Sequence, residues 1–124
     1  PFQPFEGFTE IPLTTLRLLG MTLPAAGGGY FRLAPYPLTK WAIGKAARSN
    51  AAPCIFYTHP WEIDPDQPRQ NHAPRLSRFR HYHNLHRTEG RLRRLLQDFR
   101  WGRVDQVFFA EGSPRHAVIP SWLR

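Results

Sequence analysis

The sequence has few of the residues that mark cross-linked or membrane-spanning proteins. It contains a single cysteine, Cys54, among 124 residues, which excludes an internal disulfide framework. No apolar run approaches the roughly 20 residues needed to cross a bilayer, and no signal-peptide pattern opens the chain. We therefore expect no membrane span. Because the chain begins at Pro1 without a methionine, we also expect it to be a piece of a longer protein.

Acidic residues are scarce in one segment, from Arg69 to Arg103. This segment has ten arginines against two acids, Glu89 and Asp98, and so carries the whole net charge of +8. Such a segment suits an acidic polymer or partner, and it equally suits a solvated helix face. Aromatic residues are interleaved with the arginines, but no recognised nucleic-acid-binding module accompanies them, so nucleic acid is not the expected partner.

The apolar pattern predicts alternating strands and helices. The predicted elements are strands over 7–13, 54–58 and 104–109, and helices over 38–48 and 84–99 with Asn84 as N-cap. Residues 1–6 and 65–74 are predicted loops, whereas 14–23 fits either a helical turn or extended chain. The order strand, helix, strand, helix, strand is typical of parallel α/β sheets. We therefore expect an α/β fold that forms a slice of a sheet or barrel.

His59 is the sharpest candidate for chemistry. Strand-forming residues lead into it and Pro60 ends the strand, so the histidine lies at a strand's carboxyl end, where α/β folds bind ligands. Histidine can donate a proton near neutral pH, and Glu62 or Asp64 could fix its tautomer. Alternatively, His59 only caps the strand edge and bonds to backbone. Trp61 could stack on a sugar ring, or it could simply be packed.

Two further clusters are open to more than one interpretation. Three successive glycines, Gly27 to Gly29, allow either a close approach of the backbone to another group or a flexible turn. Three histidines, His81, His83 and His86, could bind zinc in principle. Neighbouring arginines would repel a divalent cation, so we expect no metal site there.

Four motifs together resemble the C-terminal part of NodB-type polysaccharide deacetylases. They are Glu10-Ile11-Pro12, the run from Gly27 to Tyr36, the run from Phe56 to Pro65, and Arg78 to Tyr82 followed by Asn84-Leu85 and Arg87 to Glu89. The subgroup they resemble is associated with bacterial exopolysaccharide biosynthesis and exosortase systems. The resemblance implies one domain over 1–111 followed by a tail over 112–124, in a bacterial cytoplasm or cell envelope.

The resemblance also implies an irregular (β/α) deacetylase barrel, of which this chain is a C-terminal slice. That family removes N-acetyl groups from the amino sugars of polysaccharides with a divalent metal, zinc by expectation. The resemblance implies that His59 corresponds to its general acid. We expect Glu62 and Asp64 to be the candidate orienting acids, and Tyr30, Arg32 and Trp61 to face the substrate.

The sequence departs from the family pattern where the metal should bind. The early aspartate motif and the two-histidine motif are both missing. We therefore expect the piece to bind no metal, to be inactive alone, and to depend on an N-terminal catalytic half of the same protein. The alternative interpretation is a non-catalytic basic module that binds an anionic polysaccharide or nucleic acid.

Overall fold

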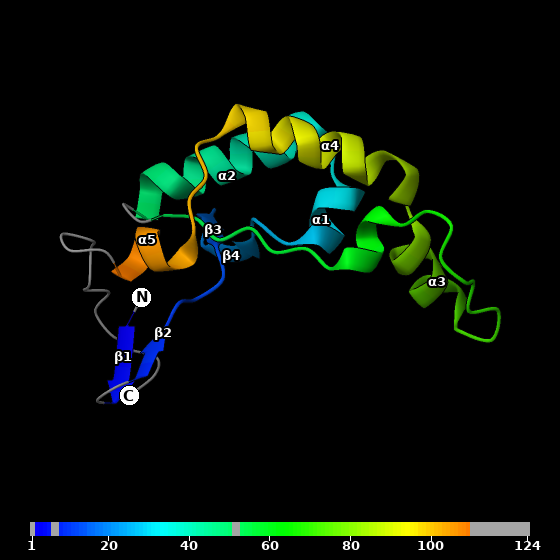
Figure 1. Cartoon of the computed structure of the whole chain (residues 1–124), viewed down its shortest axis with the longest axis horizontal. Coiled ribbons are helices and arrows are strands. Elements are labelled where there is room, and N and C mark those ends of the chain that lie inside the picture. Colours follow the sequence, from blue (N-terminus) through cyan, green and yellow to red (C-terminus); the bar gives the residue numbers. More distant parts are fainter. Residues whose placement is uncertain (1, 6–7, 51–52, 110–124) are drawn as a thin grey trace.

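The structure, a computed structural model, describes residues 2–5, 8–50 and 53–109 and combines short strands with helices (Figure 1). In chain order the elements are β1 (Phe2–Phe5), β2 (Phe8–Glu10), β3 (Thr15–Leu18), β4 (Met21–Pro24), α1 (Gly28–Leu33), α2 (Tyr36–Asn50), the 3-10 helix η1 (Pro60–Ile63), α3 (Arg75–Tyr82), α4 (Leu85–Asp98) and α5 (Val104–Phe109). The predicted domain boundary at 111 and the predicted tail over 112–124 lie outside the described residues. None of the helices within the described ranges is both long and apolar enough to cross a membrane.

The strands form two antiparallel hairpins. β1 pairs with β2, and β3 pairs with β4 from Thr15 opposite Pro24 to Leu18 opposite Met21. The second hairpin turns through Leu19 and Gly20, whose φ angles are 50° and 79°. Two consecutive positive φ angles are typical of the tight turns that match the twist of paired strands. Residues 14–23, which fitted two structures by sequence, are therefore a hairpin.

The segment that leads into His59 is extended but pairs only briefly. Gly27 and Tyr57 form one parallel bridge, in which the amide of Gly28 donates to the Tyr57 carbonyl at 3.0 Å and the Tyr57 amide donates to Ala26 at 3.1 Å. Pairing stops because α1 begins at Gly28 on one side and Pro60 follows on the other. The histidine thus follows extended chain that has a single parallel contact.

The core lies between α1, α2 and α4, with the extended segment 53–59 running along them (Figure 1). Phe31 of α1, Ile43 of α2 and Leu95 of α4 are nearly inaccessible to solvent, and the Phe56 ring packs edge-on against Phe31 at 5.2 Å. The predicted helices 38–48 and 84–99 are confirmed as α2 and α4. Their apolar stripes face this core, which is what the helical spacing predicted.

A polar contact also joins α2 to α4. The Tyr36 hydroxyl donates to Asp98 at 2.5 Å, and Asp98 also pairs with Lys40 at 3.1 Å. Burial, together with this hydrogen bond, raises the pKa of Tyr36 to about 12. The same bond from Tyr36 and a second one from Lys40 lower the pKa of Asp98. Near neutral pH the Tyr36 hydroxyl therefore stays protonated and the Asp98 carboxyl stays ionised.

Several predictions of local structure were wrong. Residues 104–109 form helix α5 and not a strand, residues 2–5 form a strand and not a loop, and the predicted strand over 7–13 is limited to Phe8–Glu10. Helix α3 was not predicted, because it has only eight residues and its apolar positions, Leu76, Phe79 and Tyr82, are too few to set a helical period. Strand pairing within the described ranges is antiparallel apart from one bridge, so the fold is mixed α/β without the predicted parallel order.

Candidate functional site

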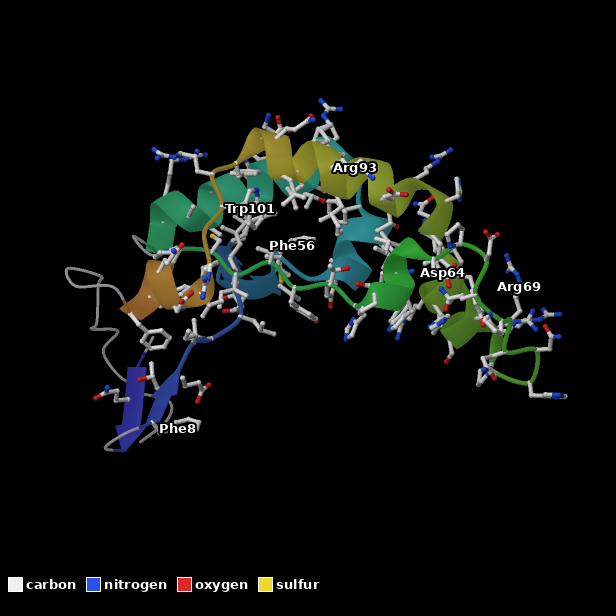
Figure 2. All side chains as sticks on the ribbon, in the orientation of Figure 1. Phe8, Phe56, Asp64, Arg69, Arg93 and Trp101 are labelled. Atoms are coloured by element: carbon white, nitrogen blue, oxygen red, sulfur yellow. The ribbon has the colours of Figure 1, made fainter. Side chains whose placement is uncertain are left out.

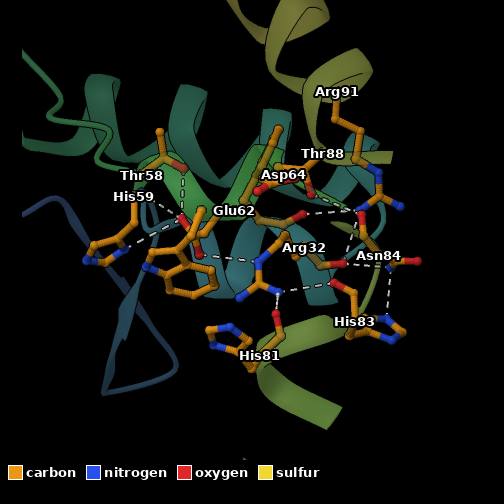
Figure 3. A network of polar contacts seen from close by, with 12 residues as sticks. Arg32, Thr58, His59, Glu62, Asp64, His81, His83, Asn84, Thr88 and Arg91 are labelled. Carbon is orange, nitrogen blue, oxygen red and sulfur yellow. Dashed lines mark hydrogen bonds and ion pairs between the residues drawn. The ribbon is translucent and has the colours of Figure 1, made fainter. Parts of the chain in front are cut away.

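A buried ion pair lies at the centre of the site. Glu62 and Arg32 are 1% and 2% exposed, and Arg32 Nε donates to Glu62 Oε1 at 3.2 Å (Figure 3). The guanidinium also donates to the backbone carbonyls of His81 at 2.7 Å and His83 at 3.2 Å. Charges this deeply buried persist only when they are paired and hydrogen-bonded. Arg32 therefore joins α1 to η1 and to the end of α3.

The second carboxylate oxygen of Glu62 faces His59. Glu62 Oε2 accepts hydrogen bonds from the Thr58 hydroxyl at 2.7 Å and the His59 amide at 3.0 Å, and it lies 3.7 Å from His59 Nδ1 (Figure 3). Glu62 faces His59 because His59 caps η1 and Glu62 is the third residue of that helix. With Nδ1 turned toward the carboxylate, Nε2 lies on the opposite edge of a side chain that is 53% exposed.

Aromatic rings fix the imidazole from its other sides. The Trp61 ring stacks on His59, with centroids 5.4 Å apart, and also on His81 at 4.3 Å. The Arg32 guanidinium lies 5.2 Å from the centroid of the same ring. Tyr57 meets His59 edge-on at 5.8 Å. Trp61 is thus engaged by two imidazoles and a cation, and it supports His59.

These groups border a cavity of about 590 Å³. Its lining residues are Gly29, Tyr30, Arg32, Leu33, Tyr57, His59, Trp61, Glu62, Ser77, Arg80 and His81. Five of the six predicted site residues therefore come together here. Tyr30 is the most open of the five, since 57% of it is exposed. The volume lies within the range of small-molecule sites, roughly 300–1,000 Å³.

Asp64 is the predicted site residue that does not line the cavity. Its Oδ1 accepts a hydrogen bond from the Asp66 amide at 3.1 Å, and its backbone carbonyl accepts one from Gln67. Asp64 is exposed and forms part of a turn. The structure therefore places Glu62, and not Asp64, beside His59. Arg32, predicted to face a substrate, instead points its guanidinium at Glu62 and backbone carbonyls.

Gly28 makes room for the buried carboxylate. A Cβ atom at this position would lie 1.8 Å from Glu62 Oε2, which is far inside van der Waals contact. At neighbouring Gly29 a Cβ would meet no described atom within 4 Å. Of the two interpretations that the three glycines left open, close backbone approach therefore applies to Gly28. The glycine run was a usable signal for the site.

Other residues of the site were missed, or considered for another role. Tyr57, Thr58, Ser77 and Arg80 were not singled out, because a strand residue, a hydroxyl or one of many arginines gives no pattern of its own. His81 was weighed only as a metal ligand. Its Nε2 instead forms a hydrogen bond with Gln67 Oε1 at 2.7 Å.

The described residues do not fit a metal site. Within the ranges that the structure covers, no three His, Cys, Asp or Glu side chains lie close enough together to hold a metal ion. His83 Nε2 is 2.8 Å from the Asn84 amide nitrogen, and the same amide group donates to the Arg32 carbonyl at 2.8 Å. Asn84 does occupy the N-cap of α4, but its side chain joins α4 to α1.

Fold and site together define a mixed α/β domain with an exposed histidine supported by a buried ion pair. The chain belongs to the family described as Domain of unknown function (DUF3473), which matches residues 1–109. The site lies entirely inside that match. Neither a curated protein nor a solved structure matches the sequence.

Proposed function

We propose that the chain is the C-terminal portion of a metal-dependent polysaccharide deacetylase that hydrolyses N-acetyl groups of amino sugars in exopolysaccharide biosynthesis. The observation that carries the proposal is His59, which has one ring nitrogen toward a buried carboxylate and the other edge toward an open cavity. The motif resemblance supports it, and so does the association of this family with polysaccharide deacetylases.

In this proposal His59 acts as the general acid. An amide nitrogen leaves poorly unless it is protonated, so Nε2 would transfer its proton to the nitrogen as the bond to the acetyl carbon breaks. The products are a free sugar amine and acetate, whose new oxygen comes from water. Glu62 keeps the ring in one orientation by holding both the His59 amide and the Nδ1 edge.

Tyr30 and Tyr57 are the side chains best placed to meet the sugar. Both line the cavity, and they are 57% and 43% exposed. An aromatic ring offers an apolar face to a sugar and a hydroxyl that can form hydrogen bonds. Trp61, the sugar platform expected from sequence, already stacks on two imidazoles. We assign the platform to Tyr30 and a supporting role to Trp61.

The proposal assigns the divalent metal, zinc by resemblance, to an N-terminal catalytic half of the same protein. The described residues do not fit a metal site, so no step is ascribed to the metal here. An apolar cavity of about 270 Å³, with exposed Leu23, Leu38 and Trp41 in its lining, is a surface that this half could cover.

The test is acetate release by the intact gene product from the exopolysaccharide of the producing cells. The His59→Ala variant should lose about a hundredfold or more in rate, the size of effect that general acid catalysis contributes. His86→Ala, which removes an exposed imidazole on α4, is the matched control and should keep the rate. Equal rates in the His59→Ala variant and the unaltered protein would defeat the proposal.

A second candidate function is a non-catalytic module that binds an anionic polysaccharide or nucleic acid. The observation in its favour is the basic segment, which carries the whole net charge of the chain. Binding by such a module weakens as salt rises. Affinity that is unchanged between low and high salt would count against the module, and acetate release that depends on His59 would favour the enzyme.

A further inference from the structure

A second cavity, of about 410 Å³, lies between the 65–74 loop and α3. Its lining residues are Arg69, Gln70, Asn71, Arg75, Arg78, Phe79, Tyr82 and His83. Three of these are arginines and none is acidic. Figure 2 shows Arg69 at the end of the molecule that carries α3, well away from Arg93 on α4. The proposed mechanism does not use this cavity.

The walls of the cavity are tied together by hydrogen bonds. The Tyr82 hydroxyl accepts from the Gln70 amide at 2.6 Å and donates to the Pro68 carbonyl at 3.0 Å. Arg78 donates to the Asn71 carbonyl at 3.1 Å. These bonds hold the proline-rich loop against α3, so the cavity exists before any ligand arrives. A preformed site loses less conformational entropy on binding.

The arginines of the cavity are not neutralised by any carboxylate among the residues that the structure describes. Within the described part of the chain, none of the ion pairs involves Arg69, Arg75 or Arg78. All three are exposed. Arg75 and Arg78 are three residues apart on α3 and therefore share one face of the helix. Guanidinium groups in this arrangement favour a carboxylate or phosphate, which they can bind through two parallel hydrogen bonds.

The aromatic rings of the cavity favour an acidic polysaccharide over nucleic acid. The Arg69 guanidinium lies 5.0 Å from the Tyr82 ring centroid, and the Phe79 ring packs on His83 at 4.7 Å. Proteins that bind single-stranded nucleic acid stack bases on open aromatic rings. Here the Tyr82 ring contacts the Arg69 guanidinium and the Phe79 ring packs on His83, and the charged groups in the lining are the arginines.

Helix α3 separates this cavity from the one that contains His59. Ser77, Arg80 and His81 line the first cavity, whereas Arg75, Arg78, Phe79 and Tyr82 line the second. Different faces of the same helix thus contribute to the two cavities.

We propose that the cavity between the 65–74 loop and α3 is a subsite for the carboxylate of a uronic acid residue in an acidic polysaccharide. The anion would sit between Arg75 and Arg78, with Arg69 closing the site from the loop. The idea that the same polymer is also the substrate of deacetylation rests on the proposed function. The binding itself does not, because the His59 cavity and this one have no lining residue in common.

The experiment measures binding of a galacturonic acid hexamer to the intact gene product by calorimetry. The Arg75→Gln/Arg78→Gln double variant should bind about tenfold more weakly and depend less steeply on salt. Arg87→Gln, which removes an exposed arginine from α4, is the matched control and should bind as the unaltered protein does. The single Arg75→Gln variant leaves the bond from Arg78 to Asn71 intact and should still weaken binding severalfold.

Comparison ligands test whether the carboxylate groups are what the cavity binds. The fully methyl-esterified hexamer has the same sugars without charge and should not bind measurably. Equal binding of the ester, or unchanged affinity in both Arg75 variants, would overturn the proposal. So would tighter arginine-dependent binding of a thymidine oligonucleotide or of phosphatidylglycerol vesicles. The His59→Ala variant should bind the hexamer normally, which separates failure of this subsite from failure of the deacetylase proposal.

Discussion

Glu62 holds two parts of the site with different oxygens. Oε1 accepts from Arg32, whereas Oε2 accepts from Thr58 and the His59 amide. A single carboxylate therefore couples a buried cation to the orientation of an exposed imidazole. The arrangement is sensitive to charge as well as to shape, because Arg32 is 2% exposed and solvent cannot replace the lost partner charge.

Replacing Glu62 by glutamine should therefore destabilise the protein. The amide keeps the size of the side chain but leaves the buried Arg32 guanidinium without a countercharge. We expect the free energy of unfolding to fall by about 3 kcal/mol, measured by urea denaturation. Glu89→Gln removes the carboxylate of an exposed pair with Arg93 and should cost less than about 1 kcal/mol. Equal losses in the two variants would contradict the buried-pair interpretation.

At the scale of residues, the sequence indicated which residue types form the site but not which residues they contact. His59, Trp61 and Glu62 could be placed together because they are adjacent in the chain. The choice between Glu62 and Asp64 required the 3-10 helix, which turns the third residue after the cap back toward it. The burial of Arg32 depends on α3 and η1, which lie 30 to 51 residues away in sequence. Local pattern carries no information about such contacts.

At the scale of elements, the start of α1 sets the space available to the site. Gly28 and Gly29 are consecutive residues of the same helix, yet only a Cβ at Gly28 would collide with Glu62. Gly28→Ala should displace the carboxylate and lower the free energy of unfolding by about 3 kcal/mol. It should also reduce acetate release, since His59 loses its support.

Gly29→Ala is the matched control for that substitution. The added methyl group meets no described atom within 4 Å, and alanine favours the helix by roughly 0.5–1 kcal/mol over glycine. We expect Gly29→Ala to be as stable as the unaltered protein or slightly more stable, by urea denaturation. A comparable loss in both variants would mean that contact with Glu62 is not what requires glycine at position 28.

The elements that sequence predicted well are those with a long apolar stripe. Helix α4 repeats its apolar residues at helical spacing over four turns, and it was predicted within one residue at each end. Helix α5 is six residues long, and a short apolar run cannot be assigned to helix or strand by spacing alone. Helix α3 has no buried residue, and its Tyr82 hydroxyl bonds to the backbone of the neighbouring loop, a contact that no spacing in the sequence indicates.

At the scale of the whole molecule, strand pairing was the feature that sequence could not supply. The alternation of strands and helices predicted parallel pairing, but residues 15–24 pair locally as a hairpin through the turn at Leu19 and Gly20. A hairpin closes a short loop, whereas a parallel pair requires a long crossover. One parallel bridge at Tyr57 remains of the predicted order, and it is the one that leads directly to His59.

The apolar surface beside β4 and α2 leads to a prediction about the intact protein. Leu38 is 52% exposed and borders the apolar cavity of about 270 Å³. If an N-terminal catalytic half covers this surface, Leu38→Ser should cost about 1–2 kcal/mol of unfolding free energy in the intact gene product. In the 124-residue chain alone the same change should cost much less, because the side chain is already half in water.

Leu19→Ser is the control for that comparison, measured in both forms by urea denaturation. Leu19 is 90% exposed at the tip of the β3–β4 hairpin, so its replacement should have a small and equal effect in both. For each variant, the loss of unfolding free energy in the 124-residue chain is subtracted from the loss in the intact gene product. The informative quantity is this difference for Leu38→Ser minus the same difference for Leu19→Ser. A value near zero would mean that the catalytic half does not pack on α2. In the proposed enzyme, a metal-binding part would then have to approach His59 from the side of the site cavity, past Tyr30 and Tyr57.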